Sequence, residues 1–254
     1  MAAGGLTHVD WQRPWLAPLA VLGQQACAHI QAGASVADAF NALIEAGAAP
    51  DPGVRFVPQS SLPPGVAYEQ FIHAEGRVPT RDNLHDFFNG VIWLHYPATK
   101  RCFNRLQARV IAAEGVGARR GPLRDALSLF DENGALLLAP PLLHAALAER
   151  QWRRLFVELR PLWRQARLLL IGHALLEKLV TPRKPITAHV YKALAAIDCV
   201  VNVDGCLAAD LDAAQLAAKP FNPLPVLGVP LWWPENENFC FYDDPLVFRG
   251  TRTP

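Results

Sequence analysis

The chain has 254 residues, of which 51% are hydrophobic and 19% are charged, and its formal net charge is +1. The hydrophobic fraction is too high and the net charge too low for an intrinsically disordered protein, and a near-neutral chain has no general attraction to nucleic acid or to anionic membranes. These figures leave a soluble globular protein long enough to bury a large core.

The cysteines and the apolar runs indicate a cytoplasmic location. The five cysteines lack the Cys-x-x-Cys spacing of zinc knuckles and redox motifs, which predicts buried thiols in a reducing compartment. The first residues lack the basic segment and the uninterrupted apolar core of a signal peptide. No apolar run approaches the roughly 20 residues of a membrane span, so we expect a cytoplasmic protein without a membrane partner.

The first half of the chain shows mainly the spacing of amphipathic helices. Ser35, followed three residues later by Asp38, predicts the start of one helix, and Pro97 predicts the start of another. Several prolines between residues 50 and 67 predict irregular structure around a short strand. The predicted elements are two helices within 14–47, a strand at 54–57, and helices at about 83–96 and 97–114.

The period of the apolar residues changes at about residue 126. Apolar runs at 126–130 and 135–139 flank the tetrapeptide DENG at 131–134. Asn-Gly between two apolar runs is the strongest short signal of a β-hairpin, because both residues tolerate positive φ. We therefore predict a β-hairpin near 126–139.

Beyond the hairpin the chain alternates between helical and strand-like segments. With no internal repeat and no linker, residues 1–254 are predicted to form one α+β domain, mostly helical, with a small sheet that includes the hairpin. Residues 220–254 are rich in proline and aromatic residues, which is typical of a segment that wraps over a core. The other predicted elements are helices at about 141–159, 173–180, 187 onward and 210–218, and a buried strand at 167–171.

Four stretches of the chain, taken in order, carry a resemblance to a known family. They are RVPTRDNLHDFFNGVIWLHYPATK, RDALSLFDENGALL, GHALLEKL and PLPVLGVP…FYDD…FR. Together they resemble a bacterial family of proteins of unknown function, numbered DUF3025, and the resemblance extends from Asp10 to Arg249. It implies a bacterial, cytoplasmic, single-domain protein and no particular reaction. Members of this family often have glycine at the position of Leu231.

Polar side chains gather at the start of the helix predicted at 83–96. His85 and Asn89 are four residues apart and therefore share one face of this helix. Such a pair can bind a metal, orient a water molecule, or hold a phosphate or carbonyl oxygen. Helix capping is an alternative role for Asn83 and Asp86, because acceptors and acids are favoured at a helix N-terminus. The residues interpreted as catalytic are His85, Asp86 and Asn89, and those expected to bind substrate are Arg81, Lys100 and Asn104.

A second cluster follows the strand predicted at 167–171. His173 and Glu177 lie four residues apart on one helix face, and His189 is near enough in sequence to fold back onto them. Two imidazoles and one carboxylate suit zinc or ferrous iron and leave positions open for substrate. The alternative is a buried histidine–glutamate ion pair that orients the helix. We predict that these three residues bind one divalent metal ion: zinc, iron or manganese.

Arginines are concentrated in two of the predicted helical segments. Residues 100–124 contain seven basic residues against one acid, and Arg101, Arg105 and Arg109 fall four apart. Residues 150–167 contain six arginines against one acid. Arginine stripes with interleaved aromatic residues can bind phosphates and stack bases, although a solvated helix face is the more common reason for a run of charge. The interleaved aromatic residues are Trp152, Phe156 and Trp163.

The sequence as a whole favours an enzyme of the hydrolase type. We expect a site of histidine, aspartate, asparagine and glutamate side chains that binds one divalent metal and a small anionic substrate bearing a phosphate or acyl group. The alternative is a non-enzymatic module that binds nucleic acid or a protein through its arginine-rich helices. A third interpretation treats the polar clusters as buried networks that stabilise a unique core. The oligomeric state is left open by the sequence.

Overall fold

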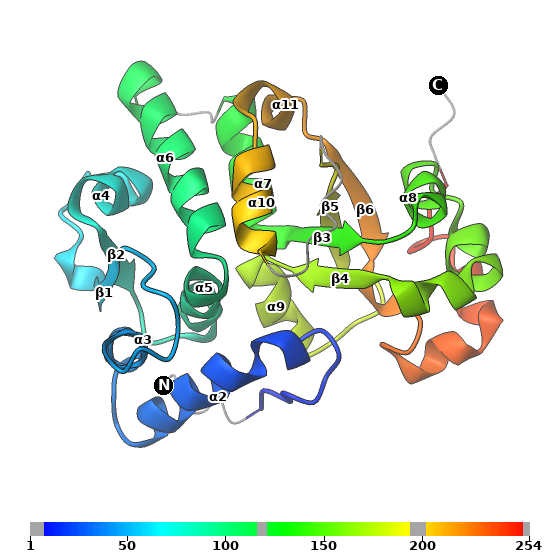
Figure 1. Ribbon diagram of the computed structural model, residues 1–254, viewed down its shortest axis with the longest axis horizontal. Coiled ribbons are helices and arrows are strands. Elements are labelled where there is room, and N and C mark those ends of the chain that lie inside the picture. Colours follow the sequence, from blue (N-terminus) through cyan, green and yellow to red (C-terminus); the bar gives the residue numbers. More distant parts are fainter. Residues whose placement is uncertain (1–7, 116–120, 194–201, 251–254) are drawn as a thin grey trace.

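The computed structural model describes residues 8–115, 121–193 and 202–250, which form a mostly helical fold with two small sheets (Figure 1). This arrangement confirms the predicted α+β class. Across these ranges, no helix combines the length and the apolar character that a membrane crossing requires. The α-helices are α2 (Ala20–Gln31), α3 (Val36–Glu45), α4 (Tyr68–Glu75), α5 (Leu84–His95), α6 (Pro97–Glu114), α7 (Pro122–Asn133), α8 (Pro141–Ala148), α9 (His173–Val180), α10 (Val203–Asp210) and α11 (Ala213–Ala217).

The helices predicted in the first half of the chain are present with nearly the predicted bounds. α2 and α3 lie within the predicted segment, and α5 and α6 begin and end within a residue of the predicted positions. Ser35 caps α3, because its hydroxyl accepts a hydrogen bond from the N–H of Asp38. The start of α6 is capped from far along the chain, because the Asp204 carboxylate accepts hydrogen bonds from the N–H groups of Ala98 (2.7 Å) and Thr99 (2.9 Å).

The strands form a four-stranded sheet and a separate two-stranded one. In the larger sheet the order is β4-β3-β5-β6, with β3 antiparallel to β4 and parallel to β5, and β5 antiparallel to β6. In the smaller sheet, β1 and β2 pair in parallel. The end of β4 leads into α9 beside the junction of α7 and β3 (Figure 1). The strands are β1 (Arg55–Pro58), β2 (Arg77–Thr80), β3 (Gly134–Leu138), β4 (Arg167–Leu170), β5 (Thr187–Tyr191) and β6 (Phe221–Pro225).

An antiparallel strand pair is present as predicted, but the first strand of the hairpin predicted at 126–139 is wrong. Residues 122–133 form the helix α7, and β3 pairs instead with β4. Ala126, Leu127 and Phe130 repeat at helical spacing and are buried together, and this burial outweighs the local turn signal. The φ of Gly134 is −74°, which any residue can adopt, so the backbone conformation does not require glycine here. Close packing does, because a Cβ at this position would lie 1.8 Å from the ring of Phe130.

Other segments of the chain also differ from the prediction. The helix predicted from Thr187 is wrong within the described residues, because 187–191 form β5, where Ala188 and Val190 alternate into the core. The helix predicted at 141–159 is interrupted after α8, since Arg150 adopts a φ of 51° before a π-helical turn, η3 (Arg154–Glu158). The C-terminal segment contributes β6 to the sheet, and α4 and β2 were not predicted.

The core is one continuous cluster of apolar side chains that extends from Val9 to Phe248. The proline- and aromatic-rich segment also contributes buried polar contacts. The Asn236 side chain, which is 0% exposed, donates hydrogen bonds to the carbonyls of Leu227 and Val229, both at 2.8 Å. This segment is therefore held by satisfied hydrogen bonds as well as by apolar packing.

Leu231 adopts a backbone conformation that favours glycine. Its φ is +68° and it is 77% exposed, so packing does not offset the strain. This left-handed region costs a non-glycine residue roughly 1 kcal/mol or more. Replacing Leu231 by Gly should therefore raise the free energy of unfolding by about 1 kcal/mol and the melting temperature by roughly 2–4 °C in thermal denaturation. Leu231→Ala keeps the Cβ atom and should give no increase, so equal stabilisation by both variants would contradict this explanation.

Candidate metal centre

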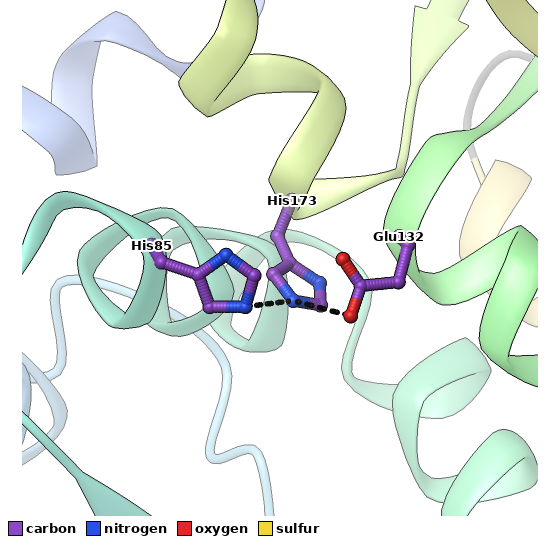
Figure 2. Close-up of side chains that lie close together, drawn as sticks. All are labelled: His85, Glu132 and His173. Carbon is purple, nitrogen blue, oxygen red and sulfur yellow. Dashed lines mark hydrogen bonds and ion pairs between the residues drawn. The ribbon is translucent and has the colours of Figure 1, made fainter.

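Three side chains from three helices converge at one point (Figure 2). They are His85 at the start of α5, Glu132 in the last turn of α7 and His173 at the start of α9, and one ligand atom from each lies within 4.8 Å of the others. The Nε2 atoms of His85 and His173 are 3.0 Å apart, and Nε2 of His173 is 3.9 Å from Oε1 of Glu132. Figure 2 shows these atoms directed toward one another. The group is therefore a candidate site for a single metal ion.

Local structure at the helix ends explains why these side chains meet. Asn83 caps α5 by accepting a hydrogen bond from the N–H of Asp86, and this places His85 in the first turn. Gly172 allows the start of α9 to pack against the end of α7, because a Cβ at this position would lie 2.5 Å from Cα of Asn133. This close approach brings His173 beside the last turn of α7.

The separation of the two imidazole nitrogens suits a shared ion. Two nitrogens that each lie about 2.0–2.1 Å from a tetrahedral zinc ion are about 3.3 Å apart. The 3.0 Å between His85 and His173 is within a few tenths of an ångström of that value. In the metal-free chain the same two atoms are close enough to share a proton in a hydrogen bond, so the histidines are already in position before an ion binds.

Glu177 was predicted to be a metal ligand, and the structure places its carboxylate against His85, outside the cluster of three. Its Oε2 atom lies 2.9 Å from Nδ1 of His85, on the opposite side of the ring from the cluster. A carboxylate can only accept, so Nδ1 of His85 carries the proton and Nε2 presents its lone pair toward the cluster. Carboxylates in this arrangement orient a metal-binding histidine and increase its basicity.

The charge states around His173 favour metal binding. Burial lowers the pKa of His173 to about 4, although the charge of Asp131 opposes this effect, so the imidazole is neutral at pH 7. Burial also raises the pKa of Glu132 above its ordinary value, which a bound cation would reverse. The Nδ1 atom of His173 is buried without a hydrogen-bond partner among the described residues, and it lies 3.9 Å from Oδ2 of Asp131.

A buried polar network lies behind the cluster. The Lys100 ammonium donates hydrogen bonds to Oδ1 of Asp131 (2.5 Å) and Oδ1 of Asn89 (2.9 Å), and the Asn89 amide donates to the Tyr68 hydroxyl (3.2 Å). Burial alone would raise the pKa of Asp131. The charges of Lys100 and then of His173 lower this pKa by a larger amount, so it lies below its ordinary value. Lys100 and Asn89, which were predicted to bind substrate and to act in catalysis, are both engaged in this network.

The other residues predicted for substrate binding also have partners in the protein. The Nε and Nη2 atoms of Arg81 donate to the two carboxylate oxygens of Asp86, both at 3.0 Å, and the backbone N–H of Arg81 adds a third bond. The Asn104 amide donates to the backbone carbonyl and the carboxylate of Glu69. Arg81 and Asp86 line the cavity described below, whereas Asn104 is not among its lining residues.

His189 lies apart from the cluster of His85, Glu132 and His173. It sits in β5, where it pairs with Gly134 on one side and Pro223 on the other, and its ring packs edge-on against Phe221. Burial lowers its pKa, and the charge of Lys178 adds to this effect. The third ligand of the cluster is Glu132, which the sequence analysis had placed in a turn. Had 122–133 been recognised as an amphipathic helix, Glu132 would have appeared in its last turn.

The cluster opens onto a cavity of about 400 Å³, which is within the size range of small-molecule sites. Helices α4, α5, α6 and α7 and the start of α9 surround it. Its wall is mostly polar and includes both histidines of the cluster. The lining residues are Gln59, Leu62, Ala67, Tyr68, Glu69, Arg81, His85, Asp86, Asn89, Gln107, Ile111, Arg124, Ser128, Asp131, Glu132 and His173.

The aromatic residues between the arginines face the core. Trp152, Phe156 and Trp163 are buried, and the indole N–H groups of the two tryptophans donate to backbone carbonyls. The arginines at 101, 105 and 109 are exposed along α6. The aromatic rings of 150–167 are thus not presented beside the arginines for stacking on bases.

Comparison with known proteins identifies a family but no activity. A family model described as Protein of unknown function (DUF3025) matches residues 54–252, a range that includes His85, Glu132 and His173. No curated protein and no solved structure matches the chain. A function for the site must therefore come from its geometry.

Proposed function

We propose that this chain, which belongs to the DUF3025 family of proteins of unknown function, is a metal-dependent hydrolase. Its divalent ion would be held by His85, Glu132 and His173. The observation that carries this proposal is the convergence of these three ligand atoms within 4.8 Å on the wall of a small-molecule-sized cavity. The ligand set differs from the predicted one, because Glu132 and His85, which was predicted to be catalytic, take the places of Glu177 and His189.

The chemistry of the ligand set supports a hydrolase. Two neutral imidazoles and one carboxylate leave at least one coordination position open, as in catalytic zinc sites, and a bound divalent ion lowers the pKa of a coordinated water to about 7. Zinc, manganese and ferrous iron all suit these donors. The partly exposed side chain of His85 leaves the position open to the cavity, since it is 30% exposed.

The proposed reaction consumes one water molecule. An oxygen–hydrogen bond of this water breaks, its oxygen forms a bond to the carbonyl carbon or the phosphorus of the substrate, and the bond to the leaving group breaks. The proton released from the water is taken up by the leaving group, so atoms and charge balance. Throughout, Glu177 keeps His85 in the tautomer whose Nε2 lone pair faces the cluster. The Asp131 carboxylate, which is paired with Lys100, lies beside Nδ1 of His173.

Metal binding tests the proposal directly. Untagged protein is treated with EDTA, dialysed against Zn²⁺ and analysed for metal. We expect about one zinc ion per wild-type chain, and none on the variant His173→Ala. His189→Ala is the control, because His189 is a partly buried histidine in β5 that lies outside the cluster.

The proposal is overturned if wild-type protein binds no divalent metal or if the two variants bind it equally. Reconstituted protein is then assayed with ester, amide and phosphoester substrates, and we expect turnover that EDTA abolishes and added metal restores. Iron as the bound metal, together with oxygen consumption, would replace hydrolysis by an oxygenase reaction at the same ligands.

A further inference from the structure

The wall of the cavity that carries Glu132 continues along α7 to a second functional group. Arg124, Ser128, Asp131 and Glu132 all line the cavity, and spacings of four, seven and eight residues place them on one face of α7. Eight residues of α-helix rise about 12 Å. The same helix therefore carries the proposed metal-binding carboxylate in its last turn and an arginine roughly two turns earlier.

Arg124 differs from the other cations near the cavity, because none of the acids that the structure describes pairs with it. Arg81 is held by both oxygens of Asp86, and Lys100 is paired with Asp131. The Nε atom of Arg124 is buried without a hydrogen-bond partner, and no carboxylate in the described parts of the chain forms an ion pair with it. A buried guanidinium donor without a partner is unfavourable in the free protein and becomes satisfied when an oxyanion enters.

We infer that Arg124 binds a carboxylate or phosphate group of the substrate, an inference that rests on the proposed function for the position of the hydrolysed bond. The planar guanidinium presents paired N–H groups that match two oxygens of such an anion. Ser128 lies one turn closer to the metal-binding cluster and offers a hydroxyl to the same substrate.

The rest of the cavity wall defines what joins the anionic group to the hydrolysed bond. Leu62, Ala67 and Ile111 add apolar surface to the lining. A cavity of about 400 Å³ is large enough to hold a small molecule. The substrate class is therefore a small molecule with an oxyanion at one end, a short spacer that has apolar surface, and an ester, amide or phosphoester bond at the other.

Oxyanion binding by the metal-free protein tests the inference without any metal chemistry. EDTA-treated protein is titrated by calorimetry at low ionic strength with inorganic phosphate and, separately, with acetate. We expect at least one of these oxyanions to bind saturably, with an affinity that falls by roughly 10-fold or more in Arg124→Gln. Arg109→Gln removes the same charge from the exposed face of α6 and should leave the affinity nearly unchanged. Preference for phosphate or acetate distinguishes the two kinds of substrate.

The melting temperature is a second measurement, and it distinguishes a substrate-binding arginine from a purely structural one. Arg124→Gln removes an unpaired buried donor, so its melting temperature should equal or exceed that of the wild type. Absence of saturable oxyanion binding to the wild type, equal binding by Arg124→Gln, or a lowered melting temperature of this variant would each overturn the inference.

Zinc binding separates this inference from the proposed function. Arg124→Gln should bind Zn²⁺ as tightly as the wild type, because Arg124 lies about two helical turns from Glu132. If zinc binds and oxyanions do not, the inference fails and the metal site stands. If oxyanions bind through Arg124 and zinc does not, the proposed function fails and an anion site remains.

Discussion

Glu132→Gln should lower the affinity of the protein for Zn²⁺ on the order of 100- to 1,000-fold, whereas Glu177→Gln should lower it by about 10- to 100-fold. The larger loss follows because Glu132 is placed to bind the ion itself. Structural zinc sites gain about 10–16 kcal/mol from roughly four ligands, or about 3 kcal/mol for each ligand. Glu177 contacts the far nitrogen of His85, so its removal weakens the orientation of a ligand and leaves every proposed ligand in place.

The two glutamates form a well-matched pair for this comparison. Both side chains are partly exposed, 42% for Glu132 and 39% for Glu177, and each substitution removes one negative charge beside a histidine of the cluster. Affinity is measured by competition with a chromophoric chelator at a fixed pH and salt concentration, and thermal denaturation checks that each variant is folded. A larger effect of Glu177→Gln than of Glu132→Gln would exchange their roles and contradict the assigned ligand set.

Lys100→Met should lower the free energy of unfolding of the metal-free protein by about 3–5 kcal/mol and its melting temperature by roughly 10 °C. The side chains of Lys100 and Asp131 are only 5% and 14% exposed, and the ammonium also bonds the Asn89 amide. Removing the lysine leaves the Asp131 carboxylate buried without its cation, and an uncompensated buried charge strongly destabilises the folded protein. Chemical denaturation in the presence of EDTA measures the change.

A second substitution shows whether the unpaired carboxylate is the cause. In Lys100→Met/Asp131→Leu both charges are gone, and most of the lost stability should return because an apolar pair of similar size can replace a buried ion pair. Lys178→Met is the control for removal of an exposed ammonium, since Lys178 donates to the Asn133 side chain at the surface, and it should change stability by less than about 0.5 kcal/mol. Equal losses in the single and double variants would show that packing around Lys100, and not the charge of Asp131, is responsible.

Local signals in the sequence were sufficient for elements whose ends are set by their own residues. α6 begins at Pro97 and ends before Gly115, whose φ of 72° suits only glycine well, and the predicted bounds match the structure. α9 was predicted correctly because Gly172 separates a buried strand from an amphipathic helix. The prediction for 126–133 was wrong, because the turn signal of Asn133-Gly134 competes with the helical spacing before it, and the burial of Phe130 favours the helix.

The members of the candidate site that stand at helix starts could be found from local signals in the sequence. His85 and His173 each stand at a helix start, a position that the sequence makes visible, and both are in the cluster. Glu132 could not be chosen while its segment was read as a turn. Glu177 and His189 were grouped with His173 by sequence distance, yet the structure turns Glu177 toward His85 and places His189 in the sheet.

The sequence by itself determined the α+β class and the starts of several helices, because capping residues and apolar periodicity act within a few residues. Four motifs indicated the family by resemblance, and the sequence singled out two members of the cluster, His173 as a metal ligand and His85 as a catalytic residue. Only the tertiary structure decided which side chains meet. The ligands come from segments about 40 residues or more apart, and they converge because the chain at Gly172 packs directly on Asn133 at the end of α7. A contact of this kind depends on how the helices pack around a common core, and local sequence preferences carry no information about that packing.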